Sequence, residues 1–489
     1  MGHSLLGAAI SETHSATLIF LGDRVYKLKK PVDLGFLDFS TRAAREAVCH
    51  REVELNRRLA PDVYLGVADV LGPDGAPCDH VVVMRRLPEE RRLATLARAG
   101  GPLDREVRDL AHVMARFHEA AMAPAPEIAA EAASRDALAR RWDQNLEVLE
   151  GAAGVVVDAP VVARVAGVAR EYLAGRSALF EHRLAAGRVR DGHGDLLADD
   201  IFCLEDGPRV LDCIEFDDRL RIGDVLADVA FLAMDLERLG RPDLSSAFLT
   251  RYRELTADTW PASLAHHYLA YRASVRAKVA CIRHGQGGYD SARSDARLLL
   301  ELADRHLRAG RVRLVVVGGL PATGKSTVAA GVAGHLGAVH LRSDELRKEL
   351  AGLSAAAAAP AALGEGIYER GSTEATYRAL LDRAAALLAM GESVVLDATF
   401  GDPRWRSEAA HVAQQTVADL TELRCATPIE VAAARAARRF RLGADVSDAD
   451  DTVVRALAPA EVAWPTAATI NTSGTPDDAI AAAMAVVEA

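Results

Sequence analysis

The sequence predicts two domains, an α+β domain followed by an α/β domain built on a doubly wound parallel sheet. Its 489 residues are about three times the ~150 residues of a typical domain. The pattern changes at Arg311, where an apolar strand, a glycine-rich loop and a helix follow one another directly. From there strands alternate with helices, which indicates a parallel sheet covered on both faces. We therefore expect one domain over residues 1–305 and a second over residues 311–489.

The composition is that of a globular protein, with 50% hydrophobic and 26% charged residues. The formal net charge of −11 creates a long-range field that repels nucleic acids and anionic membrane surfaces. We expect neither as a partner, and local contacts must hold any phosphate ligand. Only six of the 58 basic residues are lysines, so a lysine here can mark a place that needs a compact ammonium group.

The cysteines and the N-terminus indicate a reduced, cytoplasmic protein. The six cysteines, at positions 49, 78, 203, 213, 281 and 425, include no C-x-x-C pair of the kind found in zinc or redox sites. The opening MGHSLLGAAI lacks the basic region of a secretory signal. The alanine-rich tract at 355–362 is too short to cross a bilayer, so we expect no membrane segment.

The first 88 residues predict a small β-rich lobe. The runs TLIFL and RVYKLKK flank the turn dipeptide Gly22-Asp23 and predict a hairpin. A period of two places Lys27 and Lys29 on one face of it. Ser40 is the expected cap of the following helix, and VYLGVADVLGPDG with HVVVMRRL predicts a second hairpin. After this lobe we expect helices over about 102–187, a strand at RVLDCIEF and further helices up to about residue 308.

The segment GLPATGKST matches the phosphate-binding pattern G-x-x-x-x-G-K-[ST] and lies between an apolar strand and a helix. Its glycines let backbone N–H groups turn toward phosphates that also meet the positive N-terminus of the helix. In this motif Lys325 reaches the β- and γ-phosphates, and the Ser326 hydroxyl can bind Mg²⁺. The predicted nucleotide-binding residues of this loop are Gly319, Leu320, Pro321, Ala322, Thr323, Gly324, Lys325, Ser326 and Thr327.

Other candidate residues of this domain follow strands or lie on a helix. Asp397 ends an apolar strand and can orient Mg²⁺ or its water, with a turn or cap aspartate as the alternative. Asp344 begins a helix and can accept a proton from an acceptor hydroxyl, with a helix cap as the alternative. Arg435 and Arg439 lie on a helix that can form an arginine-bearing lid, and the alternative is an ordinary arginine-rich helix.

Over residues 311–489 these motifs resemble the small-molecule branch of the P-loop kinases, which includes gluconate kinase-like, polynucleotide kinase-like and zeta-toxin-like proteins. The resemblance implies that Asp344 is the acceptor-side base. It does not fix the acceptor.

A second candidate site lies in the N-terminal domain. The motif HGDL opens a loop between a helix and a strand, and Asp200 follows five residues after Asp195. In protein-kinase-like phosphotransferases the loop aspartate accepts the hydroxyl proton, and two later polar residues bind metal. Here these are Asp200 and Glu215, with Asp217 as a substitute for the second. The order of the residues along the chain also fits such a kinase, in which a lysine and a glutamate that bind and orient the nucleotide precede this loop.

In this sequence the lysine and the glutamate that precede the HGDL loop are Lys27, on an early strand, and Glu52, on the next helix. The stretches VYKLKKPVDLGFLDFST, CHREVELNRRLAPDVYLGV, HGDL and DCIEF resemble the aminoglycoside phosphotransferase-like kinases. Together with the P-loop domain, of the AAA family ATPase type, the chain resembles the bacterial family called bifunctional aminoglycoside phosphotransferase/ATP-binding proteins. The resemblance implies a bilobal, protein-kinase-like fold for residues 1–305, and it does not establish an aminoglycoside as substrate.

The sequence departs from the family pattern H-G-D-L-H-x-x-N at three positions. Leu197 replaces the histidine, Asp200 replaces the asparagine, and Glu215 stands where aspartate is usual. These carboxylates still offer the hard oxygen ligands that Mg²⁺ prefers, although the cluster becomes more anionic. A degenerate lobe retained as a scaffold is the alternative interpretation.

The sequence therefore predicts a phosphotransferase with two sites for ATP and Mg²⁺, at least one of which phosphorylates a hydroxyl group of a small molecule. One alternative is a nucleotide-responsive regulatory or binding protein with an inactive N-terminal lobe. Another is toxin-like phosphorylation of a nucleotide-sugar by the C-terminal domain. The sequence fixes neither the acceptor nor the oligomeric state.

Overall fold

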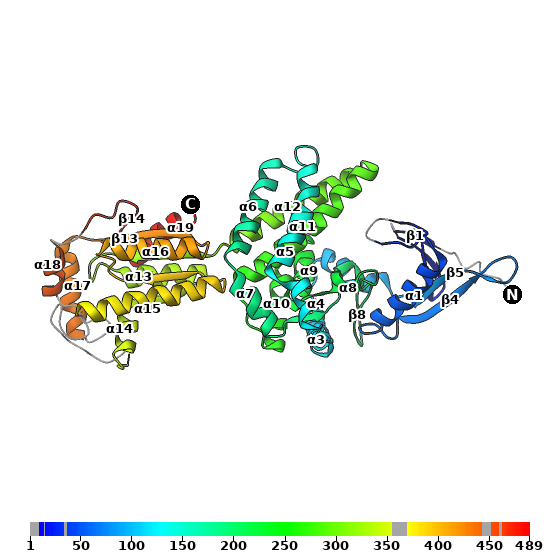
Figure 1. The fold of residues 1–489 in the computed structure, drawn as a ribbon, viewed down its shortest axis with the longest axis horizontal. Helices are drawn as coiled ribbons and strands as arrows, with labels where there is room; N and C mark the ends of the chain where they lie inside the picture. The colour runs from blue at the N-terminus through cyan, green and yellow to red at the C-terminus, as the bar shows by residue number, and fades with distance from the viewer. Residues whose placement is uncertain (1–8, 14, 34–36, 355–368, 443–450, 459–461) are drawn as a thin grey trace. The chain divides into compact units, whose positions relative to one another are not determined.

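The computed structural model describes residues 9–13, 15–33, 37–354, 369–442, 451–458 and 462–489. The chain divides into two compact units, whose elements are labelled in Figure 1. Unit 1 comprises Met1–Gly167, Phe180–Trp260 and Ala265–Leu307, and unit 2 comprises Val168–Leu179, Pro261–Leu264 and Arg308–Ala489. The HGDL motif therefore lies in unit 1 and the phosphate loop lies in unit 2.

Unit 1 begins with a five-stranded antiparallel sheet in the order β1-β2-β3-β5-β4. The strands are β1 (Ala9–Glu12), β2 (Ala16–Leu21), β3 (Arg24–Lys29), β4 (Tyr64–Leu71) and β5 (Pro77–Arg85). The structure confirms both predicted hairpins, because β2 pairs with β3 around Gly22-Asp23 and β4 pairs with β5. Strand β1 extends the sheet beyond the predicted hairpin.

Helix α1 (Arg42–Asn56) packs against strands β4 and β5 of this sheet. The prediction that Ser40 caps it is wrong by one residue, because the Thr41 side chain accepts the capping hydrogen bond from Ala44 N. The Ser40 backbone N–H donates instead to Asp38 Oδ1. The core shared by helix and sheet consists of Val25, Cys49, Val53, Ala60, Val63, Tyr64, Val82, Met84, Phe202 and Leu211.

The rest of unit 1 is mainly helical, as the sequence predicts. Its helices are α2 (Leu93–Ala99), α3 (Asp104–Ala120), α4 (Pro126–Ala133), α5 (Arg135–Gly151), α8 (Asp218–Arg221), α9 (Val225–Arg238) and α10 (Pro242–Thr256). Four more helices, α6 (Ala159–Ala174), α7 (Ser177–Ala185), α11 (Ala262–Gly287) and α12 (Asp290–Ala309), contribute residues to both units. The strand pairs β6 (Val189–Asp191) with β9 (Ile222–Asp224), and β7 (Ile201–Leu204) with β8 (Gly207–Val210), lie among them. The predicted strand RVLDCIEF is shorter than expected and ends at Val210, since Asp212 has a left-handed φ of 63°, which an extended strand cannot contain.

Unit 2 contains a five-stranded sheet in the order β11-β12-β10-β13-β14, and every neighbouring pair is parallel. Its strands are β10 (Arg313–Gly318), β11 (Val339–Arg342), β12 (Val394–Asp397), β13 (Asp419–Ala426) and β14 (Ala468–Asn471). Its helices are α13 (Lys325–Leu336), α14 (Ser343–Leu350), α15 (Arg370–Ala389), α16 (Pro403–Gln415), α17 (Ile429–Leu442), α18 (Asp451–Leu457) and α19 (Pro476–Val487). The predicted α/β class is confirmed.

The strand order makes this sheet doubly wound. From β10 the chain moves to β11 and β12 on one side and then to β13 and β14 on the other. Because crossovers between parallel strands are right-handed, reversing the direction places helices on opposite faces. Ligands bind such sheets at the carboxyl end of the strand where the direction reverses. This strand is β10, and the phosphate loop follows it.

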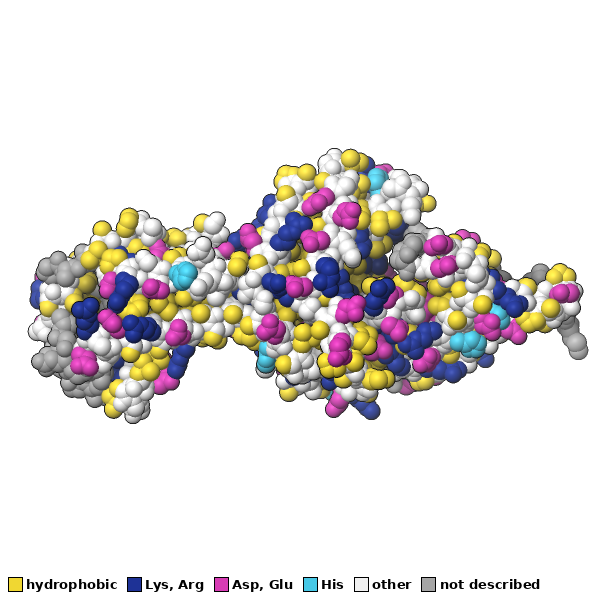
Figure 2. All heavy atoms as spheres, viewed as in Figure 1, with side chains coloured by type: hydrophobic (Ala, Val, Ile, Leu, Met, Phe, Trp, Pro, Cys, Tyr) yellow, Lys and Arg dark blue, Asp and Glu magenta, His cyan; other side chains and the backbone are white. Residues whose placement is uncertain are grey.

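Among the helices of the described residues, none has both the length and the apolar character needed to cross a membrane. Figure 2 shows one face of the molecule, on which Lys and Arg side chains are interspersed with Asp and Glu side chains.

Candidate functional site

The β2–β3 hairpin brings two lysines to one buried glutamate. Lys27 and Lys29 lie two residues apart on β3 and therefore point to the same face. Glu52 of α1 places Oε1 2.8 Å from Lys27 Nζ and Oε2 2.6 Å from Lys29 Nζ. Burial alone lowers the pKa of Lys27, but Asp212, Glu52 and Glu215 outweigh it and raise this pKa well above its usual value. Lys27 is therefore charged and held in place by two elements of the lobe.

The two acidic residues that follow β8 bind different lysines. Asp212 Oδ1 lies 2.5 Å from Lys27 Nζ, and half of the Asp212 side chain is exposed. Glu215 Oε1 lies 2.5 Å from Lys29 Nζ, and both of these side chains are almost fully buried. Glu215, predicted as a metal ligand, is thus held in a buried ion pair, whereas Asp212 reaches solvent beside Lys27. Asp217, the sequence alternative, caps α8 and binds an exposed arginine.

Three carboxylates act on one another around the HGDL loop. Burial raises the pKa of Asp195 to about 6, with Arg276 opposing this shift and Asp212 adding to it. Burial, Asp212 and Asp195 together raise the pKa of Asp200 well above its usual value. Repulsion disfavours the charged forms of Asp195 and Asp200, whereas Lys27 lowers the pKa of Asp212; a divalent cation near these oxygens would relieve the repulsion. Asp200 and Asp212 therefore fit Mg²⁺, which needs only one or two carboxylates when phosphates supply the other oxygens.

Within the described residues, no group of three or more His, Cys, Asp or Glu side chains is arranged to hold a metal ion by itself.

Asp228 of α9 holds the backbone of the HGDL loop. Its Oδ2 accepts a hydrogen bond from His193 N, and its Oδ1 accepts one from Gly194 N, each at 2.8 Å. The His118 ring nitrogen Nε2 lies 3.0 Å from Asp228 Oδ2. Burial would raise the pKa of Asp228, but these contacts outweigh burial and hold it far below the usual range. The loop that carries Asp195 is thus fixed by a buried carboxylate on a rigid helix.

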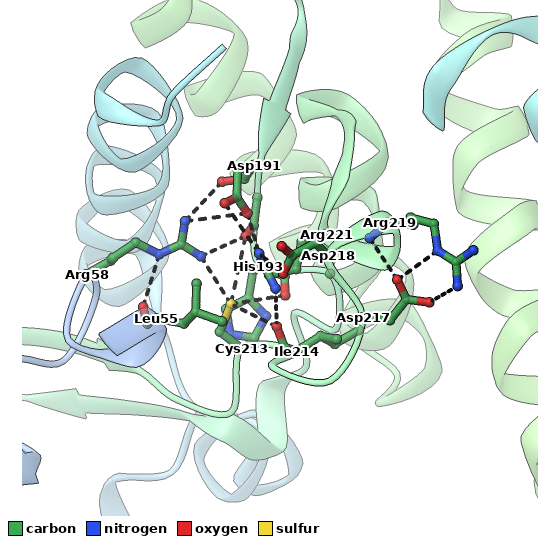
Figure 3. A network of polar contacts seen from close by, with 12 residues as sticks. Leu55, Arg58, Asp191, His193, Cys213, Ile214, Asp217, Asp218, Arg219 and Arg221 are labelled. Carbon is green, nitrogen blue, oxygen red and sulfur yellow. Dashed lines mark hydrogen bonds and ion pairs between the residues drawn. The ribbon is translucent and has the colours of Figure 1, made fainter. Parts of the chain in front are cut away.

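Arginines tie the same loop to α1 and to the segment after β8, as Figure 3 shows. Arg58, two residues beyond α1, donates to the backbone oxygens of Asp191 and the next residue at 3.3 and 3.1 Å. Arg221 binds the Asp191 carboxylate at 2.8 Å and donates to Ile214 O at the same distance. One polar network therefore sets the positions of the helix with Glu52, the loop with Asp195 and the segment with Asp212.

In unit 2 the phosphate loop joins β10 to α13 and has a backbone shape that only small residues allow. Gly319 has a φ of 131° and Ala322 a φ of 62°. A Cβ atom on Gly319 would lie 2.4 Å from Cys425 O, so this position requires glycine. Thr472, just after β14, donates to Thr323 O at 2.6 Å. The loop is therefore fixed at the switch point of the sheet, with its N–H groups at the start of α13.

The predicted lysine, serine and aspartate of unit 2 converge on this loop. Lys325 Nζ donates to Leu320 O at 2.9 Å and so lies over the loop. Asp397 is buried at the end of β12, next to β10. Burial raises its pKa, but the nearby His340 and Ser326 side chains and the charge of Lys325 outweigh burial and lower it. An ionised Asp397 beside the Ser326 hydroxyl provides the oxygens that fit Mg²⁺ at a nucleotide.

Asp344 lies farther along the same edge of the sheet. It is the second residue of α14, directly after β11. Arg347 of the same helix donates from Nη1 to the Thr373 hydroxyl of α15 at 3.1 Å. Asp344 itself is half-buried, and its charge adds to the effect of burial that raises the pKa of the Tyr377 hydroxyl of α15.

Arg435 of α17 lies beside the phosphate loop. Its Nη2 donates to Thr472 O at 2.8 Å, and a Cβ atom on Gly324 would lie 3.9 Å from its Nη1. This position suits contact with a phosphate. The side chain of Arg439, the second predicted lid arginine, lies outside the described residues.

Sequence reasoning missed Asp212 and Asp228. The sequence could have indicated a further carboxylate such as Asp212, because Lys27 and Lys29 lie on one face. If both are buried and charged, they need more than one carboxylate partner. The left-handed φ that aims Asp212 at Lys27 leaves no sequence signal. Asp228 lies in an apolar helical run, DVLADVAFL, where a buried carboxylate signals a bound partner but does not identify it.

Comparisons with known proteins assign both units. A family model described as "Phosphotransferase enzyme family" matches residues 23–266, and one described as "AAA domain" matches residues 314–459. Uncharacterized proteins of Mycobacterium tuberculosis and Mycobacterium bovis are 43% identical over 465 residues, which cover 95% of this chain and 92% of theirs.

Two solved structures are each similar to part of this chain. A choline/ethanolamine kinase family protein from Mesorhizobium loti covers 62% of this chain and 88% of its own, with 16% identity and a TM-score of 0.41. A gluconokinase from Sinorhizobium meliloti covers 36% of this chain and 91% of its own, with 17% identity and a TM-score of 0.27.

The two matched families account for the two units, and both kinase-like domains support a phosphotransferase activity. The identity to the mycobacterial proteins extends over nearly the whole of each chain, so both domains and their order are shared. The chain therefore belongs to a family of two-domain proteins in which an aminoglycoside phosphotransferase-like kinase domain precedes a P-loop kinase-like domain.

Proposed function

We propose that this chain is an ATP-dependent phosphotransferase with two nucleotide sites, and that unit 1 phosphorylates a hydroxyl group of a small molecule. The observation that carries the proposal is the convergence of Lys27, Asp195, Asp200 and Asp212 from separate elements on one place. A bond forms between the acceptor oxygen and the γ-phosphorus, while the bond from that phosphorus to the β–γ bridging oxygen breaks. The hydroxyl proton passes to Asp195.

We assign a separate role in this reaction to each site residue of unit 1. Lys27 binds the α- and β-phosphates, and Glu52 orients its ammonium group. Asp200 and Asp212 would hold Mg²⁺, which when bound supplies positive charge that neutralises the phosphates. Glu215 with Lys29 fixes the segment that carries Asp212. The Asp195 pKa of about 6 leaves this carboxylate mostly ionised at neutral pH, as a proton acceptor requires.

In unit 2 we propose a second site for Mg²⁺ and ATP. The backbone N–H groups of the phosphate loop and Lys325 bind the phosphates, and Arg435 adds a charge beside them. The Ser326 hydroxyl and Asp397 hold the metal. Asp344 accepts the proton of a second hydroxyl acceptor.

A full-length variant isolates the unit 1 site for a test. The Lys325→Ala substitution disables the proposed nucleotide site of unit 2. Calorimetry then measures the binding of the ATP analogue AMP-PNP to unit 1 with and without Mg²⁺. We expect Mg²⁺-dependent binding that Lys27→Ala weakens by about tenfold to a hundredfold, the cost of one charge-assisted contact. No binding to unit 1 at saturating Mg²⁺ contradicts the proposal.

A measurement of turnover distinguishes an active kinase from a protein that only binds nucleotide. In the same background we expect ATP consumption with a hydroxyl acceptor, which Asp195→Asn lowers by about 10²–10⁴-fold while AMP-PNP affinity stays nearly unchanged. The matched control is Asp199→Asn, because Asp199 is a half-exposed neighbour that pairs with Arg98. Nucleotide binding with no turnover would favour the regulatory alternative.

A further inference from the structure

Helix α11 places an arginine against the backbone of the HGDL loop. Arg272 Nε donates to Ala227 O at 2.9 Å, and Nη1 lies 3.4 Å from the backbone oxygen of Gly194, which precedes Asp195. The guanidinium carbon lies 4.6 Å from the ring centroid of Phe231. Arg272 is half-buried, and its hydrogen bonds and cation–π contacts within the described residues are to backbone oxygens and aromatic rings, with no ion pair to a described carboxylate. Its position is therefore fixed by neutral groups, and its charge remains available.

A second arginine lies one helical turn farther along α11. Arg276 is four residues from Arg272 and so lies on the same face of the helix. It is half-buried, and within the described chain it forms neither a hydrogen bond nor an ion pair. Arg272 contacts the backbone oxygen of Gly194, which directly precedes Asp195, so the shared face of α11 places both arginines on the Asp195 side of the loop. The charges of Arg276 and Arg272 both oppose the rise in the Asp195 pKa that burial causes.

The acidic groups near Asp195 already have cationic partners. Asp212 binds Lys27 at 2.5 Å. Asp235 is buried, binds Arg238 at 2.7 Å and accepts a hydrogen bond from a backbone N–H of the loop. In the proposed function Asp200 is a ligand of Mg²⁺, so Asp195 is the remaining carboxylate opposite Arg272 and Arg276, and the two arginines of α11 together provide one positive charge in excess on this side of the loop.

We propose that the acceptor of the unit 1 site carries a phosphate or carboxylate group in addition to its reacting hydroxyl, and that Arg276 with Arg272 binds this anion. The inference rests on the function proposed for unit 1. The planar guanidinium matches phosphate and carboxylate geometry with paired N–H donors. An aminoglycoside or another polycation would meet repulsion at the same place. The anionic group does not react; it orients the hydroxyl toward Asp195.

The first experiment measures anion binding directly. Full-length protein with Lys325→Ala is saturated with AMP-PNP and Mg²⁺, so that the unit 1 nucleotide site is filled, and titrated with inorganic phosphate in a calorimeter. We expect Arg276→Ala to weaken phosphate binding by about tenfold or more. Arg283→Ala is the matched control, because Arg283 is exposed on the same helix, about 10 Å farther along its axis. Equal phosphate affinity in Arg276→Ala and Arg283→Ala would overturn the proposal.

The second experiment identifies the source of the anion. ADP release is measured with glucose, glucose 6-phosphate, gluconate, glucosamine and kanamycin as acceptors. We expect the phosphate- or carboxylate-bearing compound to be turned over best, and Arg276→Ala to raise its KM about tenfold or more with a smaller effect on kcat. Better turnover of glucosamine or kanamycin than of every anionic compound would overturn the proposal. Failure of AMP-PNP to bind unit 1 is a separate result, since it contradicts the proposed function itself.

Discussion

Lys29 Nζ and Glu215 Oε1 lie 2.5 Å apart, although 186 residues separate them in the sequence. The pair is almost fully buried, and Glu52 is the second partner of the same lysine. Burial raises the pKa of Glu215, although Lys29 opposes this effect. The contact joins β3 to the segment after β8 and so sets the position of Asp212 relative to Lys27.

This arrangement predicts different outcomes for Glu215→Gln and Asp212→Asn. Glu215→Gln removes one charge partner of buried Lys29 and should lower the free energy of unfolding by roughly 1–3 kcal/mol. Asp212→Asn changes a half-exposed side chain, so it should change stability little and weaken the Mg²⁺ dependence of AMP-PNP binding. Thermal unfolding and calorimetry in the Lys325→Ala background measure both effects. If Glu215→Gln instead weakened the Mg²⁺ dependence and Asp212→Asn lowered the stability, the metal ligand would be Glu215 and not Asp212.

Most of the architecture could be predicted from the sequence because apolar periodicity and turn residues determine it locally. The hairpin at Gly22-Asp23 and the parallel sheet of unit 2 follow from such patterns. The assignment of lysine partners could not, since it depends on a single left-handed residue, Asp212. The position of the α11 arginines beside the HGDL loop could not be predicted either, because sequence spacing does not reveal that Arg272 contacts the loop of Asp195.

The pKa of Asp195 predicts an acid limb in the activity of unit 1. Because burial raises this pKa to about 6, the proton acceptor is neutral below that pH and ionised above it. The kcat/KM of the Lys325→Ala protein should therefore fall as the pH drops through about 6. Asp212→Asn removes a charge that raises the Asp195 pKa, so the limb should move to lower pH in this variant. A limb that stays in place, or moves to higher pH, contradicts the assignment of Asp195.

Asp228 should act as a positioning residue for the same loop. Asp228→Ala leaves His118 and two buried backbone N–H groups without their acceptor, and we expect a loss of about 3–5 kcal/mol in stability. Asp228→Asn keeps one acceptor and should fold, with a lower kcat but nearly unchanged AMP-PNP affinity. The control is Asp243→Asn, which alters an exposed pair with Arg241. Equal kcat in the two asparagine variants would contradict the positioning role.

Two glycines of unit 2 should respond to alanine in opposite directions. Gly319→Ala introduces a Cβ atom 2.4 Å from Cys425 O at a φ of 131°, so the phosphate loop must shift and its N–H groups lose their arrangement. Gly334 lies exposed within α13 and has no atom within 4 Å of an added Cβ. Gly334→Ala should therefore stabilise the protein by roughly 0.5–1 kcal/mol, because alanine loses less backbone entropy in a helix.

The measurement separates the effect on the loop from a general effect of the substitution. In a full-length Lys27→Ala background, which weakens the unit 1 site, calorimetry of AMP-PNP with Mg²⁺ reports mainly on the phosphate loop. Gly319→Ala should lower this affinity by about tenfold or more, since the N–H groups contribute charge-assisted hydrogen bonds to the phosphates. Gly334→Ala should leave it unchanged while raising the unfolding temperature. Tight binding by Gly319→Ala would show that the phosphates do not depend on the loop shape described for Gly319.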